Sequence, residues 1–221
     1  MAVREGVDSG VGETMSATRL LVLGVVRGQG RAHGYLVGRE LLSWGAEHWA
    51  NVKWGSIYHA LKQLTKEGKL RAGAEPGDSA PGRTVYELTG EGEAEFLRLL
   101  RDALSSADHR PDVLGAGLAM LPALPRAEAI ALLRHRLDEL EATLGRLSAM
   151  LDRSRARETP PHVPELYGLW VDTARGGAEW TRRLIGRLEA GAYAMAGEEG
   201  AAFGAGAWSG TGCATAGSGT G

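Results

Sequence analysis

Residues 54–70 read WGSIYHALKQLTKEGKL, and their periodicity is the clearest structural pattern in the chain. Apolar residues recur at the i, i+3, i+4, i+7 spacing of one helix face, which predicts an amphipathic helix with a buried stripe of Ile57, Ala60, Leu61 and Leu64. Ser56 is expected to be the N-cap, because a serine hydroxyl can accept a hydrogen bond from a free N–H of the first turn. Gly68 is expected to end the helix as its C′ residue.

The period changes directly after this helix. Residues 70–74 and residues 84–88 (TVYEL) alternate apolar and other side chains, which predicts two short strands. The segment between them, EPGDSAPGR, is rich in turn formers, so the strands should form a β-hairpin with a long tip. Thr89 is expected to cap a further helix that ends near residue 104.

Two helices are predicted upstream of residue 54. The first covers about residues 20–26, the second begins near Gly34, and residues 45–53 break the helical pattern. Three helices, a hairpin and a fourth helix over residues 16–105 describe a winged helix-turn-helix domain. The predicted fold class is mainly α with a small β-hairpin, in which this DNA-binding domain precedes a C-terminal helical dimerisation domain.

Residues 111–195 form that second predicted domain and carry no strand pattern. Pro125 should open a helix that runs to about residue 157, in which apolar residues repeat at alternating steps of three and four, as in a coiled-coil seam. The seam positions are Ile130, Leu133, Leu137, Leu140, Leu144, Leu147 and Leu151. The charged residues between them, among them His135 and Arg136, are expected to face solvent.

A final helix is expected over about residues 165–191, after a proline-rich break at residues 158–164. Two long helices can form an antiparallel hairpin, but such a hairpin has little core of its own. We expect the seam residues to meet a second copy of the chain, which makes them the predicted dimer interface. The alternative is that they pack on the winged domain of the same chain.

Both ends of the chain are predicted to be flexible tails. Residues 1–15 are aperiodic, and residues 197–221 hold nine glycines and almost no charge. The one cysteine, Cys213, excludes an internal disulfide and a zinc site built on cysteines. No apolar stretch reaches 18 residues and residues 1–15 lack the apolar core of a secretory signal, so we expect no membrane partner and a cytoplasmic location.

The net charge of −2 conceals a basic segment. Residues 50–74 carry five lysines and arginines against one glutamate, whereas residues 106–196 carry 12 charges of each sign. This local excess favours a polyanion partner, although a solvated helix face would give the same pattern. The outer face of helix 55–68 offers groups that can contact phosphates or base edges, on Ser56, Tyr58, His59, Lys62, Gln63 and Lys66. Arg83, beside Gly82 at the hairpin tip, is expected to contact the minor groove or backbone unless it is only a solvated turn residue.

The sequence contains no recognisable enzyme site. Its six histidines are scattered without metal-ligand spacing, and no phosphate-binding glycine motif follows a predicted strand. We therefore predict no catalytic residue, no metal site and no cofactor.

Three motifs, in this order, resemble the PadR family of transcriptional regulators. AHGYLVGREL (32–41) is similar to the second helix of that family, WGSIYHALKQLTKEGKL (54–70) to its recognition helix, and GRTVYELTGEG (82–92) to its wing strand and the turn into the fourth helix. The resemblance covers about residues 17–104 closely. It extends more loosely to residues 111–195, where the family has a helical domain used for dimerisation.

The resemblance implies a homodimeric regulator, usually a repressor, that binds a pseudo-palindromic operator in double-stranded DNA. The motif positions expected at or beside DNA are Tyr35, Ser56, Tyr58, Lys62 and Arg83, while His59 stands where many members have proline. Some members bind flat aromatic compounds between tryptophans. Trp170 and Trp180, about 15 Å apart along the final helix, are therefore candidate effector-binding residues, although both could be core residues.

Two functions from different classes remain open at this point. The first is a dimeric winged-helix regulator of the PadR type, whose operator binding a small molecule relieves. The second keeps the dimer without DNA, as a binder of hydrophobic small molecules or a scaffold for partner proteins. The basic segment over residues 50–74 favours the first.

Overall fold

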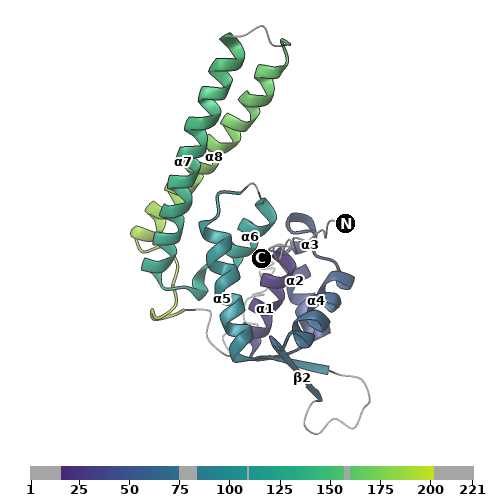
Figure 1. Cartoon of the computed structure of the whole chain (residues 1–221). Helices are drawn as coiled ribbons and strands as arrows, with labels where there is room; N and C mark the ends of the chain where they lie inside the picture. Colours follow the sequence, from purple (N-terminus) through teal and green to yellow (C-terminus); the bar gives the residue numbers. More distant parts are fainter. Residues whose placement is uncertain (1–15, 75–83, 109, 157–159, 202–221) are drawn as a thin grey trace, which may run out of the picture.

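The computed structural model describes residues 16–74, 84–108, 110–156 and 160–201. A winged helix-turn-helix domain forms the lower part of the molecule, and a hairpin of two long helices rises from it (Figure 1). Residues 1–15, the hairpin tip with Arg83, and residues 202–221 with Cys213 lie outside the described residues, so the expectations for them have no structural counterpart here.

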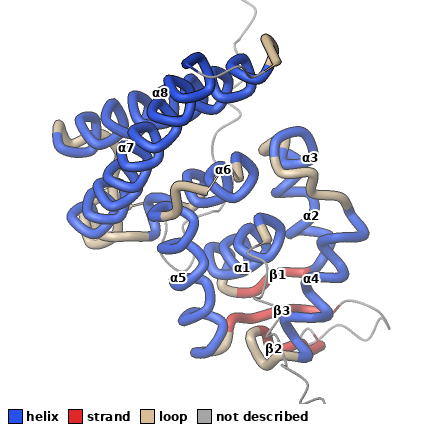
Figure 2. Tube along the Cα trace, turned by 45° about the horizontal axis from the view of Figure 1, so that its top comes forward, coloured by secondary structure: helices blue, strands red, loops and turns tan. Residues whose placement is uncertain are grey.

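The winged domain contains five helices and a three-stranded sheet among its described residues. The helices are α1 (Ala17–Gln29), α2 (Gly34–Ser43), α3 (Ala46–Trp49), α4 (Trp54–Lys66) and α5 (Gly90–Ser105), and the strands are β1 (Arg31–His33), β2 (Leu70–Ala74) and β3 (Thr84–Leu88). The predicted hairpin is confirmed as β2 and β3. The strand β1, which the sequence analysis missed, pairs antiparallel with the other edge of β3, so that the strand order is β1-β3-β2 (Figure 2).

The C-terminal part consists of α6 (Pro111–Ala119), a short 3₁₀ helix η1 (Leu121–Ala123), α7 (Arg126–Ala156) and α8 (Val163–Glu189). Figure 1 shows α7 and α8 side by side, and Arg134–Glu189 and Arg182–Glu141 ion pairs of 2.6 Å tie them together in antiparallel register. Arg126, the first residue of α7, donates to the carbonyl oxygens of Leu188 and Ala192, where α8 ends. Free carbonyls at a helix end need such donors, so Arg126 closes the base of the hairpin.

The segment after α8 turns back to this base. The carboxylate of Glu198 accepts two hydrogen bonds of 2.7 Å from Arg126 and one from the backbone N–H of Met195. These bonds lower the pKa of Glu198 to about 2. From composition, Glu198 is part of the predicted flexible tail at residues 197–221. In the structure its side chain is instead bonded to Arg126 at the base of the hairpin.

The seam residues of α7 are largely covered within one chain. Leu133 is fully buried in the core that α7 shares with the winged domain, and Ile130 and Leu137 pack against the same core. Leu140 and Leu151 are buried as well, whereas Leu144 and Leu147 are half-buried. The first third of the seam, Ile130 to Leu137, thus packs against the core of its own chain. This was the alternative to a dimer interface in the sequence analysis.

Three expectations about local structure were wrong. Ser56 is not the N-cap of α4 but its N3 residue, because the helix begins at Trp54 and Lys53 is the cap. Residues 46–49 form the short helix α3, although Gly45 before it suggested a break. Arg136, expected to face solvent, is buried between α7 and the segment that follows α5.

The turn into α5 joins the sheet to the helices. The hydroxyl of Thr89 accepts a hydrogen bond from the N–H of Gly92 and donates to the carbonyl oxygens of Gly68 and Lys69. The predicted cap at Thr89 is therefore confirmed, and Gly68, with φ of 72°, ends α4 as expected. Gly92 packs so closely against the carbonyl of Lys69 that a Cβ there would overlap the oxygen.

We predict that Gly92→Ala destabilises the protein by about 3 kcal/mol, because the methyl group can be accommodated only if α5 moves away from residue 69. The matched control is Gly90→Ala in the same helix turn, where an added Cβ meets nothing within 4 Å, and we expect it to change stability by less than about 1 kcal/mol. Urea unfolding of both variants measures the difference. Equal stability of the two would contradict this account of the turn.

Candidate nucleic-acid interface

Three stacked aromatic rings lie at the start of α4. The rings of Tyr35 and Trp54 have centroids 5.6 Å apart and lie within 14° of parallel, and Trp54 and Tyr58 follow at 6.2 Å and 24°. All three side chains reach solvent, with exposed fractions of 63% for Tyr35, 38% for Trp54 and 48% for Tyr58. They form a continuous aromatic surface across the first turns of α2 and α4, which we call the aromatic row.

Two glycines one helical turn apart in α2 make this row possible. A Cβ on Gly38 would overlap the Trp54 ring, and a Cβ on Gly34 would lie 2.7 Å from Cε1 of Tyr58. The rings of Trp54 and Tyr58 therefore lie directly on the backbone of α2. Tyr35 and Tyr58 are among the residues predicted from the sequence, whereas Trp54, whose ring lies between theirs, is not.

The other candidate residues on α4 differ in whether their polar groups already form hydrogen bonds within the chain. Tyr58, His59, Lys62 and Lys66 project outward from the predicted inner stripe. Ile57, Leu61 and Leu64 of this stripe are fully buried, whereas its fourth member, Ala60, is half-buried. The Ser56 hydroxyl donates to the carbonyl of Lys53 and accepts from its N–H, so its proton is already used within the helix cap. Gln63 is exposed, but its amide donates to Glu67 at 2.8 Å, and contact with a base would require that bond to break.

The wing carries opposing charges on its described residues. Glu87 of β3 pairs with Arg31 of β1 at 2.5 Å and lies 4.0 Å from Arg71 of β2. One carboxylate faces two guanidinium groups, and Arg71 is well exposed, so this face of the sheet keeps a net positive charge. Arg71 is a candidate contact that the sequence analysis did not select, because only the pairing of β2 with β3 shows its place beside the hairpin.

A separate cavity of about 940 Å³ lies between the α7–α8 hairpin and the segment that joins α5 to α6. Trp170 and Trp180, both on α8, line it together with Arg136 of α7 and Leu114 of α6. Trp170 is partly exposed and Trp180 is partly buried against the core. The structure thus brings the two predicted effector residues to one cavity of a size that suits small ligands.

Metal-binding clusters and membrane-spanning helices are both absent from the described residues. No group of three or more histidine, cysteine, aspartate or glutamate side chains there could hold a metal ion. None of the helices described is both long and apolar enough to cross a bilayer.

Most of the winged domain matches the model of a known protein family. Residues 22–98 match the model of the transcriptional regulator PadR-like family. These residues form a PadR-like domain. The matched region runs from within α1 into α5 and contains the aromatic row, the recognition helix and the wing, whereas α7 and α8 lie beyond it.

Solved structures of PadR-family regulators are also similar to this chain. Bacillus subtilis PadR in complex with operator DNA is 20% identical over 77% of this chain and 98% of the other, with a TM-score of 0.33. The same protein in complex with p-coumaric acid is 20% identical over 80% and 98%, with a TM-score of 0.35. A PadR-like regulator from Bacillus cereus is 21% identical over 79% and 99%, with a TM-score of 0.34. No relative with a curated description matches the chain.

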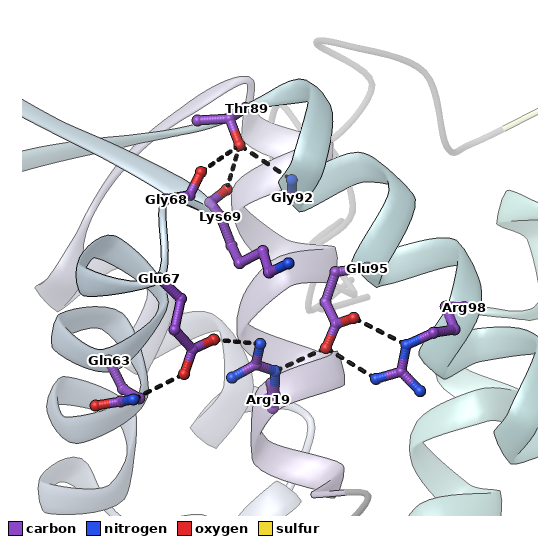
Figure 3. Close-up of polar contacts among 9 residues, drawn as sticks. All are labelled: Arg19, Gln63, Glu67, Gly68, Lys69, Thr89, Gly92, Glu95 and Arg98. Carbon is purple, nitrogen blue, oxygen red and sulfur yellow. Dashed lines mark hydrogen bonds and ion pairs between the residues drawn. The ribbon is translucent and has the colours of Figure 1, made fainter. Parts of the chain in front are cut away.

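A partly buried ionic network joins the end of α4 to α1 and α5 (Figure 3). Arg19, just ahead of the matched residues on α1, donates to Glu67 at the end of α4 at 2.5 Å and to Glu95 of α5 at 3.0 Å. Glu95 also accepts two hydrogen bonds from Arg98. One guanidinium group therefore joins three helices, and Figure 3 shows it lying between the two carboxylates.

The network shifts the pKa values of its members. The hydrogen bond from Arg19 lowers the pKa of Glu67 below its ordinary value. Burial alone would raise the pKa of Glu95, but the bonds and charges of Arg98 and Arg19 outweigh it and lower that pKa as well. Both carboxylates thus stay ionised at more acidic pH in the folded chain than in the unfolded one.

We predict that Arg19→Met destabilises the protein at pH 7 by about 2–3 kcal/mol, since it leaves two carboxylates without their shared partner. The stabilisation from lowered carboxyl pKa values is complete above the unfolded value of about 4.3 and is lost as pH falls through the folded values. Between about pH 5 and pH 3 the wild type should therefore lose more stability than Arg19→Met. Arg175→Met, which breaks an exposed pair with Asp172, is the control and should cost less than about 1 kcal/mol.

Proposed function

We propose that this protein is a homodimeric DNA-binding transcriptional regulator, most simply a repressor, that places one recognition helix α4 of each subunit in the major groove of a pseudo-palindromic operator. One observation carries the proposal: within a PadR-like domain, α4 presents an outward face of lysine, histidine and tyrosine side chains while Ile57, Leu61 and Leu64 of its inner stripe are fully buried. Amines and hydroxyls on a rigid helix are the groups that bind phosphates and base edges.

The aromatic row and the lysines have different tasks in this proposal. Lys62 and Lys66 supply charge, which gives affinity without reading sequence. Tyr35 and Tyr58 offer hydroxyls at positions that the stacking on Trp54 keeps fixed. Fixed donors lose little side-chain entropy on binding, so they favour precise docking of α4.

The proposal of a dimer rests on apolar surface that the chain leaves uncovered. Leu166, Leu169 and Trp170 are large apolar side chains of α8 with 42–63% of their surface exposed. Leu144 and Leu147 of α7, from the predicted seam, are only half-buried. A second copy would cover this surface, and a twofold pair of subunits would present two recognition helices to two half-sites.

The proposal also includes a small-molecule effector that changes the binding of the protein to DNA. Bacillus subtilis PadR has been solved both with operator DNA and with p-coumaric acid. In the present chain the cavity beside Trp170 and Trp180 is a place for such a ligand. Its wall includes Leu114 of α6, and the next residue, Gly115, packs against Trp49 of α3 in the helix-turn-helix. A rigid-body shift of α6 is therefore the route by which we propose occupancy alters the placement of α4.

The same cavity favours the second candidate, a small-molecule binder that does not act on DNA. One measurement distinguishes the two functions, namely the affinity of the protein for the DNA upstream of its own gene. Binding of ligands without any affinity for that DNA would favour the second.

We predict that Lys62→Ala weakens binding to this upstream DNA and lowers the slope of log affinity against log salt by about 1, because one phosphate contact is lost. Fluorescence anisotropy at several salt concentrations measures both quantities. Arg155→Ala is the matched control, since Arg155 is an exposed cation at the far end of α7. If the two variants bound alike, α4 would not be the helix that contacts DNA.

We predict that Leu169→Glu converts the dimer to a monomer, because a carboxylate would have to enter the apolar surface between subunits. The side chain is 63% exposed within the chain, so the fold of each subunit should remain intact. Light scattering coupled to size-exclusion chromatography gives the mass, with Arg175→Glu on the same helix as the control. A dimer unaffected by Leu169→Glu would place the interface elsewhere.

A further inference from the structure

Trp54, the first residue of α4, carries a partly exposed indole ring at the junction between α2 and α4. Its benzo ring lies against the backbone of α2, because the atoms that a Cβ on Gly38 would meet are Cζ3, Cε3 and Cη2. These three atoms belong to the six-membered part of the indole. The N–H belongs to the five-membered part, at the other end of the ring system, and takes no part in this contact.

The indole N–H of Trp54 has no acceptor within the part of the chain that the structure describes. The indole of Trp49 differs in this respect, although its exposed fraction of 36% is close to the 38% of Trp54. Its N–H donates to the carbonyl oxygen of Trp44 at 3.0 Å. Because an indole N–H can only donate, Trp54 offers a donor to an acceptor outside the chain.

The neighbouring side chains favour an acceptor that is negatively charged. Lys53 directly precedes Trp54, Arg39 directly follows Gly38, and both are exposed. The first turn of α4 contains no acidic residue. A phosphate oxygen is an acceptor of this kind, and hydrogen bonds to charged acceptors are roughly twice as strong as those between neutral groups.

The side of α4 on which Trp54 lies selects the DNA backbone rather than the bases. In a helix-turn-helix the recognition helix enters the major groove, while the helix before it crosses the sugar–phosphate backbone. Trp54 lies on the flank of α4 that packs on α2, whereas Lys62 and Lys66 lie on the outer face. If the outer face occupies the groove, the flank beside α2 meets the backbone at the edge of that groove.

We propose that Trp54 is a DNA-contact residue whose indole N–H donates a hydrogen bond to one phosphate oxygen in each half-site. The inference rests on the proposed function and adds a residue that neither the basic segment nor the motif positions selected. An indole is neutral, so this bond neutralises no phosphate and releases no counterion. Trp54 therefore adds affinity without adding to the salt dependence, in contrast to Lys62.

The variant that tests this bond is Trp54→Phe, which deletes the N–H and keeps an aromatic ring against Gly38. We expect it to weaken binding to the DNA upstream of the protein's own gene about tenfold, because a hydrogen bond to a charged group is lost. The slope of log affinity against log salt should stay unchanged. Fluorescence anisotropy at several salt concentrations measures both quantities.

The matched control is Tyr193→Phe. It deletes the polar group of another exposed aromatic side chain, on the segment after α8, and should change the affinity by less than about twofold. Unchanged affinity of Trp54→Phe would overturn the inference. A salt slope that falls by about 1 in Trp54→Phe would also overturn it, because the lost contact would then involve a charge.

A second experiment identifies the phosphate. Methylphosphonate linkages, which replace a charged phosphate oxygen by a methyl group, are placed one at a time along the same DNA. We expect one linkage in each half-site that weakens the wild type but weakens Trp54→Phe no further, the mark of two groups in contact. If every linkage affected both proteins equally, the N–H would have no phosphate partner.

Two outcomes separate this inference from the proposed function. If Trp54→Phe fails to fold, Trp54→Leu replaces it, since leucine also lacks the N–H and keeps an apolar group against α2. Wild-type protein that does not bind the upstream DNA would overturn the proposed function and this inference together. Binding that depends on Lys62 but is unaffected by both Trp54 variants would overturn the inference alone.

Discussion

A single helix, α1, is enclosed by the other elements of the winged domain, and the arrangement of both parts of the chain depends on its burial. Leu20, Leu21, Val22, Leu23 and Val26 point in different directions around α1, yet each has at most 1% of its surface exposed. A helix that is apolar all round is stable only when neighbours cover every side. Here α2, α4, α5, α6 and β3 provide that cover.

The same helix explains why the two predicted domains share one core. Gly24 of α1 leaves the space that the side chain of Met120 fills at the end of α6. Beyond this contact the core continues into α7 through Leu133 and into α8 through Leu184 and Leu188. The base of the helical hairpin is therefore part of the hydrophobic core around α1, and the ionic network at Arg19 fixes α4 to that core from another side.

Elements with a strong local pattern could be predicted from the sequence, and those defined by distant partners could not. The helix α4, the hairpin and the cap at Thr89 follow from spacing and residue type within a few positions. The strand β1 has only three residues and exists because β3 offers it an edge. The repeat in α7 showed that Leu133 and Leu140 are buried but not which surface covers them. For Arg136 a helical pattern suggested solvent, and only the approach of Ser106, 30 positions away, buries it.

The length of α7 has a mechanical consequence. The helix has 31 residues, about 46 Å, and only its first third is anchored in the common core. Beyond residue 137 the helix projects away from the winged domain with α8 beside it (Figure 1). A tilt of about 5° at residue 137 would displace the far end of α7 by about 2.5 Å, because each residue adds 1.5 Å to the length of the helix. Because Leu140 and Leu147 of this same part of α7 line the cavity, such a tilt would also change the width of the cavity.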